Sequence, residues 1–121
     1  MFDLRSATWR GLRVDQLPTG QAVYLLHFTR GHPIGRHPRH YIGYSPSLRR
    51  RINGHRDGSS YAKYPRAMLA AGIRFRVARV WVGAAVTLEK RLKAYKKVRD
   101  YCPICRPALR QENPPRLRLV A

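Results

Sequence analysis

The chain has 121 residues, of which 25 are Lys or Arg and only 6 are Asp or Glu, giving a formal net charge of +19. This length fits one domain, and a hydrophobic content of 44% argues against a disordered chain. Self-repulsion makes such a charge excess costly for folding, so it indicates a polyanionic partner, of which nucleic acid is the expected class.

The same composition argues against secreted and membrane proteins. No apolar run reaches the length of a membrane span, and the first residues lack the apolar segment of a signal peptide. No long amphipathic helix pairs a basic face with an apolar one, as a membrane-surface protein would need. Two cysteines close together do not make a secreted disulfide framework. We therefore expect a cytoplasmic protein without a membrane partner, nucleoid-associated if its source is bacterial.

The first elements predicted along the chain form a hairpin. Residues 1–20 are expected to form an N-terminal arm. Residues 22–28 are a nearly continuous apolar run, typical of a strand buried on both faces. Residues 29–39 contain Gly and Pro and predict a loop. Residues 41–44 are aromatic and β-branched and predict the second strand.

Helices and one more strand follow the hairpin. Ser45-Pro46 predicts a helix start, and that helix ends near residue 55. Residues 65–71 predict a short helix. Residues 74–82 predict a strand whose alternation slips phase, as a bulge or a partly wet face would cause. The last helix is expected from about Thr87.

This order of elements predicts an α+β fold, an α/β sandwich in which a three-stranded sheet is flanked by helices. The folded domain is expected over residues 21–100. Residues 101–121 contain Cys102-Pro103-Ile104-Cys105 and several prolines, and they predict a basic, extended tail.

The stretch from the second strand into the following helix carries residues suited to phosphate. Tyr41 lies in the strand, and Arg51 and His55 are four residues apart on the helix, so the three side chains could converge on one surface. Arginine grips phosphate with a planar fork of donors. A basic, solvated helix is the alternative interpretation.

A wider pattern contains this stretch. Ala22-Val23-Tyr24 is followed by Tyr41-Ile42-Gly43, by an arginine eight residues beyond that glycine, by a histidine four further on, and by Glu89 on the last helix. The ordered set resembles the GIY-YIG endonuclease domain over residues 20–100. That family has a three-stranded antiparallel sheet flanked by helices, and it cuts phosphodiester bonds with one divalent metal ion, usually Mg²⁺ or Mn²⁺. The resemblance implies a DNA endonuclease.

The resemblance also implies a role for each matched residue. Tyr24 is the candidate base or water-positioning phenol, and Tyr41 helps to orient water and phosphate. Arg51 holds the scissile phosphate, His55 supports the site, and Glu89 binds the Mg²⁺ or Mn²⁺ ion. The flanking cations expected to contact nucleic acid are Arg49, Arg50, Lys93, Lys96 and Lys97.

Two of these roles have alternatives. A free tyrosine titrates near pH ~10, so Tyr24 acts as a base only if the metal and the arginines favour its phenolate; otherwise a metal-bound hydroxide does the work. Glu89 precedes Lys93 by four residues and could form a surface ion pair. The chain also departs from the family. Ala22-Val23 replaces Gly-Ile, and Asn113 does not clearly match the downstream asparagine that many members carry.

Two functions from different classes follow. The first is a divalent-metal-dependent endonuclease with limited sequence specificity, selective for single strands or branched structures, or guided by a protein partner. The second is a non-catalytic module that binds DNA or RNA. The net charge fits both, whereas a lone carboxylate in a basic surface favours the enzyme.

The cysteine pair predicts a further metal site. Cys102 and Cys105 have zinc-knuckle spacing, and His37 and His40 have the same interval, so the four residues could hold a structural Zn²⁺ ion and tie the tail to the hairpin. Two reduced thiols or a redox disulfide are the alternatives. No partner is assigned to His27.

Overall fold

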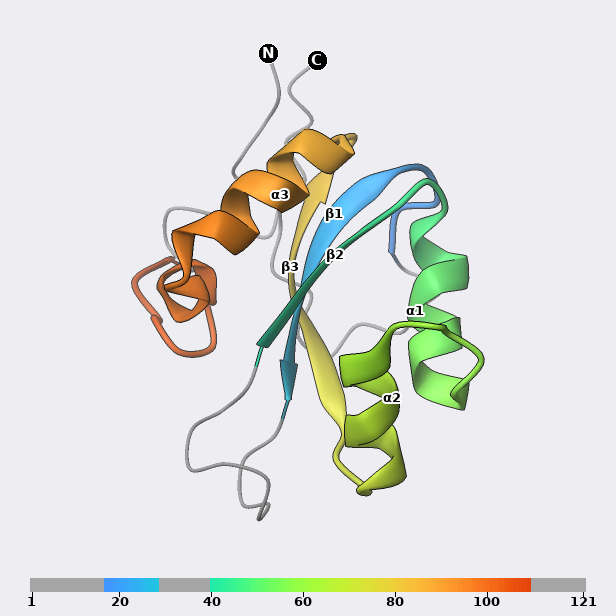
Figure 1. Ribbon diagram of the computed structural model, residues 1–121. Helices are drawn as coiled ribbons and strands as arrows, with labels where there is room; N and C mark the ends of the chain where they lie inside the picture. The colour runs from blue at the N-terminus through green and yellow to red at the C-terminus, as the bar shows by residue number, and fades with distance from the viewer. Residues whose placement is uncertain (1–16, 29–39, 110–121) are drawn as a thin grey trace.

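The computed structural model describes residues 17–28 and 40–109 (Figure 1). Three strands, β1 (Ala22–Phe28), β2 (His40–Ser45) and β3 (Phe75–Val82), form one antiparallel sheet in the order β2-β1-β3. The helices are α1 (Leu48–Asp57), α2 (Lys63–Ala70), α3 (Val86–Tyr95) and the short 3₁₀ helix η2 (Val98–Tyr101). The expected α+β fold with a three-stranded antiparallel sheet is confirmed.

Helices cover both faces of the sheet: α1 and α2 lie on one side and α3 on the other (Figure 1). In the part of the chain that the structure describes, no helix has the length and apolar content needed to cross a membrane.

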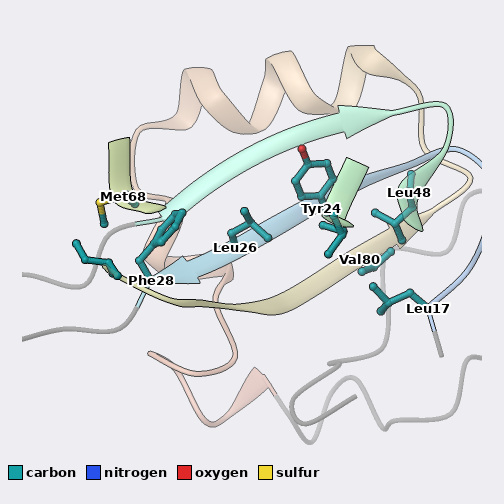
Figure 2. Packing of buried hydrophobic residues seen from close by; sticks show 10 residues of the cluster. Leu17, Tyr24, Leu26, Phe28, Leu48, Met68 and Val80 are labelled. Atoms are coloured by element: carbon teal, nitrogen blue, oxygen red, sulfur yellow. The ribbon is translucent and has the colours of Figure 1, made fainter. Parts of the chain in front are cut away.

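The central strand β1 supplies side chains to two cores, because successive residues of a strand point to opposite faces. Tyr24, Leu26 and Phe28 pack with α1 and α2 in the first core, which Figure 2 shows. Val23 and Leu25 pack on the α3 side in the second core. Every residue of β1 is buried, as the nearly continuous apolar run predicted.

The phase slip predicted in the third strand is a bulge. Leu25 pairs with Arg79, whereas the next residue, Leu26, pairs with Val77, so Ala78 is the extra residue on β3. Ala78 is fully buried in the second core. The bulge therefore explains why the hydrophobic alternation of residues 75–82 changes phase partway along the strand.

The helix starts differ from the predictions. Helix α1 begins at Leu48 and not at Ser45-Pro46, because the backbone N–H of Ser47 donates to Ser45 Oγ at 2.9 Å and closes a turn before the helix. Helix α2 begins at Lys63, two residues before Pro65, and ends at Ala70.

The ends of the expected domain also differ. Leu17, assigned to the arm, is buried, and Gly20 O accepts a hydrogen bond from Leu48 N at 3.1 Å. The expectation of an extended tail from residue 101 is wrong for its first residues, because Tyr101 packs edge-on against Trp81 and Cys102 is fully buried. The rest of the arm, the loop 29–39 and residues 110–121 lie outside the described residues.

Candidate active site and metal-ligand cluster

The phenol of Tyr24 lies against the backbone of β2. Tyr24 pairs with Gly43 across the sheet, and a Cβ added at Gly43 would lie only 2.4 Å from Tyr24 Oη. Only glycine leaves room for the ring at this position. Figure 2 shows the hydroxyl turned away from the surrounding aliphatic side chains and toward β2.

Tyr24, Tyr41 and His55 form a cluster of three rings, here called the tyrosine cluster. Tyr24 Oη and His55 Nε2 lie 2.6 Å apart, within hydrogen-bonding distance. The ring centroids of Tyr24 and Tyr41 are 6.3 Å apart, and those of Tyr41 and His55 are 5.7 Å apart. His55 reaches the strands because Leu48 and Ile52, on the same helix, are fully buried and hold α1 against the sheet.

Burial keeps the Tyr24–His55 pair uncharged. Burial raises the pKa of Tyr24, as do the neighbouring Tyr41 and Glu89, while Arg51 opposes the shift through its charge and a hydrogen bond. Burial, followed by the charge of Arg51, lowers the pKa of His55 to about 4. Arg51 alone therefore does not produce the Tyr24 phenolate that a role as a base would require. At neutral pH a phenol faces a neutral imidazole.

Glu89 approaches this cluster from α3, which packs against β2, and its charge acts on the phenol of Tyr24. Its carboxylate lies 3.1 Å from Lys93 Nζ, and the side chain of Glu89 is only 16% exposed. Lys93 Nζ in turn lies 5.6 Å from the centroid of the Tyr41 ring. The ion pair predicted as an alternative role for Glu89 is present, and its lysine lies near the ring of Tyr41.

An open cavity of about 630 Å³ adjoins the start of α1. Arg51 lines it, and Arg51 Nη1 also donates to Tyr44 O at 3.4 Å. Tyr61, in the same lining, is 92% exposed. The full lining consists of Ser45, Pro46, Ser47, Arg50, Arg51, Gly54, Ser59, Ser60, Tyr61 and Ala62. The cavity thus combines two guanidinium groups, several hydroxyls and an exposed aromatic ring.

The remaining cations predicted to bind nucleic acid lie in other settings. Arg49 Nε donates to Leu17 O at 2.6 Å and so fastens the chain before β1 to α1. Lys96 ends α3 in a left-handed conformation with φ of 68°, and Lys97 follows it; both are exposed. Two of the five predicted cations lie near the candidate site: Arg50 lines the cavity, and Lys93 lies beside the Tyr41 ring of the tyrosine cluster.

Four potential metal ligands meet on the α3 side of the sheet. They are His27, His40, Cys102 and Cys105, here called the His/Cys cluster, and their ligand atoms all lie within 4.8 Å of one another. Both cysteines are free thiols. Burial lowers the pKa of His27 and lowers that of His40 to about 4, and burial raises the pKa of Cys102 to about 11.

The sequence foresaw three of these four residues. His40, Cys102 and Cys105 were predicted, whereas the fourth member is His27, to which no partner had been assigned. The predicted fourth ligand, His37, and Asn113 both lie outside the described residues. His27 could have been found from register: pairing Tyr24 with Gly43 also pairs His27 with His40.

Comparisons with protein-family models, with curated proteins and with solved structures find no match for this chain.

Proposed function

We propose that this protein is a divalent-metal-dependent endonuclease of the GIY-YIG type that hydrolyses phosphodiester bonds in DNA. The observation that carries the proposal is the convergence of Tyr24, Tyr41, Arg51, His55 and Glu89 around the paired strands β1 and β2. These residues come from four different elements. A basic module that only binds phosphate has no use for a half-buried carboxylate among them.

The Tyr24–His55 pair is suited to moving a proton. As water attacks phosphorus, its proton passes to Tyr24 Oη, and the phenol's own proton passes to His55 Nε2 at 2.6 Å. The new P–O bond forms to the water oxygen, and the P–O bond to the leaving alkoxide breaks. An imidazolium is unfavourable at this buried site until the negative phosphate arrives, so the relay is favoured only with substrate bound.

His55 also has a route for losing the proton. It lines a second cavity of about 270 Å³ between α1 and α2, and its Nδ1 has no hydrogen-bond partner among the described residues. A proton accepted at Nε2 can leave from Nδ1 into this space. A cavity of that volume is large enough to hold water.

Arg51 and Glu89 supply the charges that hydrolysis needs. The Arg51 guanidinium neutralises negative charge on the phosphate oxygens, with its planar fork of donors. One carboxylate is a sufficient protein ligand for Mg²⁺ or Mn²⁺, because these ions keep most of their waters and bind substrate phosphate. Glu89 fits that donor set, and the cation would add Lewis-acid stabilisation of the phosphorane charge. Lys93 must move from Glu89 to admit it.

The open cavity beside Arg51 suggests the path of the nucleic acid. Arg50 and Arg51 can hold successive phosphates, and the exposed ring of Tyr61 offers a face for a base to stack on. Base stacking is indifferent to sequence and requires an unpaired base. This arrangement supports limited sequence specificity and a preference for single-stranded or distorted DNA.

The test is cleavage of labelled plasmid, linear duplex, single-stranded and branched DNA, and of RNA, in Mg²⁺ or Mn²⁺. Glu89→Gln removes the carboxylate charge while keeping its volume, and we expect a loss of cleavage of about 10²-fold or more. DNA binding should be retained or strengthened, because a negative charge has been removed from a basic surface. Asp57→Asn, which changes an exposed carboxylate at the end of α1, is the matched control and should cut like the parent.

The alternative function makes the opposite prediction. If the chain is a binding module, parent and Glu89→Gln bind every substrate and neither cuts any of them in either metal. Equal cleavage by parent and Glu89→Gln would instead point to a contaminating nuclease or to an active site elsewhere, and it would also reject the proposal.

A further inference from the structure

The His/Cys cluster joins two parts of the chain that are far apart in sequence. His27 and His40 face each other where β1 ends and β2 begins. Cys102 and Cys105 come from the turn after η2, where Arg106 N donates to Cys102 O at 2.8 Å. The turn holds the two sulfur atoms on the α3 side of the sheet, above the two imidazoles.

Four of the six distances between the ligand atoms are close to the edges of a tetrahedral zinc centre, and all six are within 4.8 Å. Zinc bonds of about 2.05 Å to nitrogen and 2.3 Å to sulfur imply N···N edges of about 3.3 Å and N···S edges of about 3.5 Å. His27 Nδ1 and His40 Nε2 are 3.3 Å apart. Cys105 Sγ lies 3.7 Å from His27 Nδ1 and 3.4 Å from His40 Nε2, and Cys102 Sγ lies 3.4 Å from His27 Nδ1.

The chemistry of the donors selects the same kind of ion. Two thiols and two imidazoles are soft and borderline ligands that suit Zn²⁺ and not Mg²⁺ or Ca²⁺. A bound metal ion takes thiolates and neutral imidazoles as ligands, so the thiol protons leave to solvent as the ion enters.

We propose that the His/Cys cluster binds one Zn²⁺ ion in a closed, four-ligand structural site. The ion fastens the segment after η2 to the ends of the hairpin strands, in addition to the burial of Cys102 in the second core and the hydrogen bond that Arg79 Nη1 donates to Tyr101 O at 3.2 Å. The site shares no residue with the tyrosine cluster and does not depend on the proposed nuclease activity. A negative result for either proposal therefore leaves the other standing.

The first measurement is the metal content of the full-length protein, purified under reducing conditions without a metal-binding tag. We expect about one zinc ion per chain. Exchange with Co²⁺ should give the visible absorption of a tetrahedral cobalt site together with a thiolate-to-cobalt charge-transfer band. Removal of zinc with a strong chelator should lower the midpoint of thermal unfolding by about 10 °C or more.

Substitutions then identify the ligands. Cys105→Ser and His27→Ala should each reduce the zinc content to a small fraction of the parent value. His37→Ala is the decisive control, because His37 is the histidine that sequence spacing alone selects; it should keep about one ion per chain. Each variant is also titrated with Co²⁺. The cobalt spectrum reports the ligand set directly, so the conclusion does not depend on the zinc content of a variant that folds poorly.

Several results would overturn the proposal. The first is a parent protein that contains no zinc, has two freely titrating thiols and gives no cobalt spectrum. Retention of zinc by His27→Ala combined with its loss in His37→Ala would reject the ligand set. A Cys102–Cys105 disulfide in protein prepared without oxidant would replace the metal site with a redox pair.

Discussion

The tyrosine cluster and the His/Cys cluster use opposite faces of the same hairpin and differ in polarity and access. Tyr24 and His27 are three residues apart on β1, so they point to opposite faces of the sheet. The tyrosine cluster brings an arginine, a lysine and a carboxylate together beside a cavity open to solvent. The His/Cys cluster consists of two imidazoles and two cysteine sulfurs, with no carboxylate among its described members.

This difference separates the proposed substrate site from the proposed structural metal site. A reaction on phosphate requires charge that is stabilised locally and reachable by a polyanion. A structural metal requires the reverse, a set of ligands that fills every coordination position and excludes solvent. One hairpin can carry both clusters because they share no residue.

The largest effect that would separate the clusters is expected from Tyr24→Phe. Removing the hydroxyl breaks the link to His55 Nε2, and loss of a positioned proton acceptor should reduce cleavage by about 10²- to 10⁴-fold. Binding of DNA and the zinc content should stay at parent levels. Tyr44→Phe is the matched control, since its hydroxyl donates to Gln21 Oε1 outside the cluster. Equal loss in both variants would mean that the effect is structural.

The pH dependence of stability should report the burial of His55 beside Tyr24. Its pKa falls from the ordinary 6.5 to about 4 on folding, so between these values the unfolded chain binds a proton that the folded chain does not. The stabilisation is therefore complete above pH 6.5 and is lost as pH falls toward 4. Over that interval His55→Gln should lose less stability than the parent, by an amount on the order of 2 kcal/mol, in urea unfolding. If the free energy of unfolding changed with pH in the same way for the parent and His55→Gln, the burial of an uncharged His55 would be contradicted.

Gly43→Ala tests whether the tyrosine cluster depends on close contact between β1 and β2. The new methyl group would lie 2.4 Å from Tyr24 Oη, so the ring must move. We expect a loss of about 1–3 kcal/mol in the free energy of unfolding, with cleavage reduced further than stability explains. Gly20→Ala, which meets no atom within 4 Å, should be neutral. Zinc content should be unaffected in both.

The smallest effect is expected at the rim of the cavity. Tyr61 is 92% exposed, so Tyr61→Ala should leave the unfolding midpoint unchanged. Loss of a stacking face should weaken binding of single-stranded DNA by about 1 kcal/mol or more, a roughly five-fold rise in Kd. Binding of fully paired duplex should change less. An equal loss on both substrates would show that Tyr61 does not stack on unpaired bases.

Much of this arrangement was predictable because local patterns determine it. The apolar run of β1 and the phase slip of β3 indicated a buried central strand and a bulge. The spacing of Arg51 and His55 indicated that both lie on one side of a single helix. Helix starts were less predictable, because Ser45 bonds within a turn when it could have capped α1. That choice depends on the path of the chain leaving β2.

By itself the sequence determined the fold class, the positive field and the identity of the residues available for phosphate chemistry, because periodicity, composition and residue type are local properties. Only the tertiary structure decided which of these residues meet. It placed Glu89 beside the tyrosines and paired it with Lys93, it showed that burial outweighs Arg51 at the Tyr24 phenol, and it brought His27 to the cysteines. The reason is that antiparallel register and the docking of a C-terminal turn join residues up to 78 positions apart, a relation that no spacing along the chain encodes.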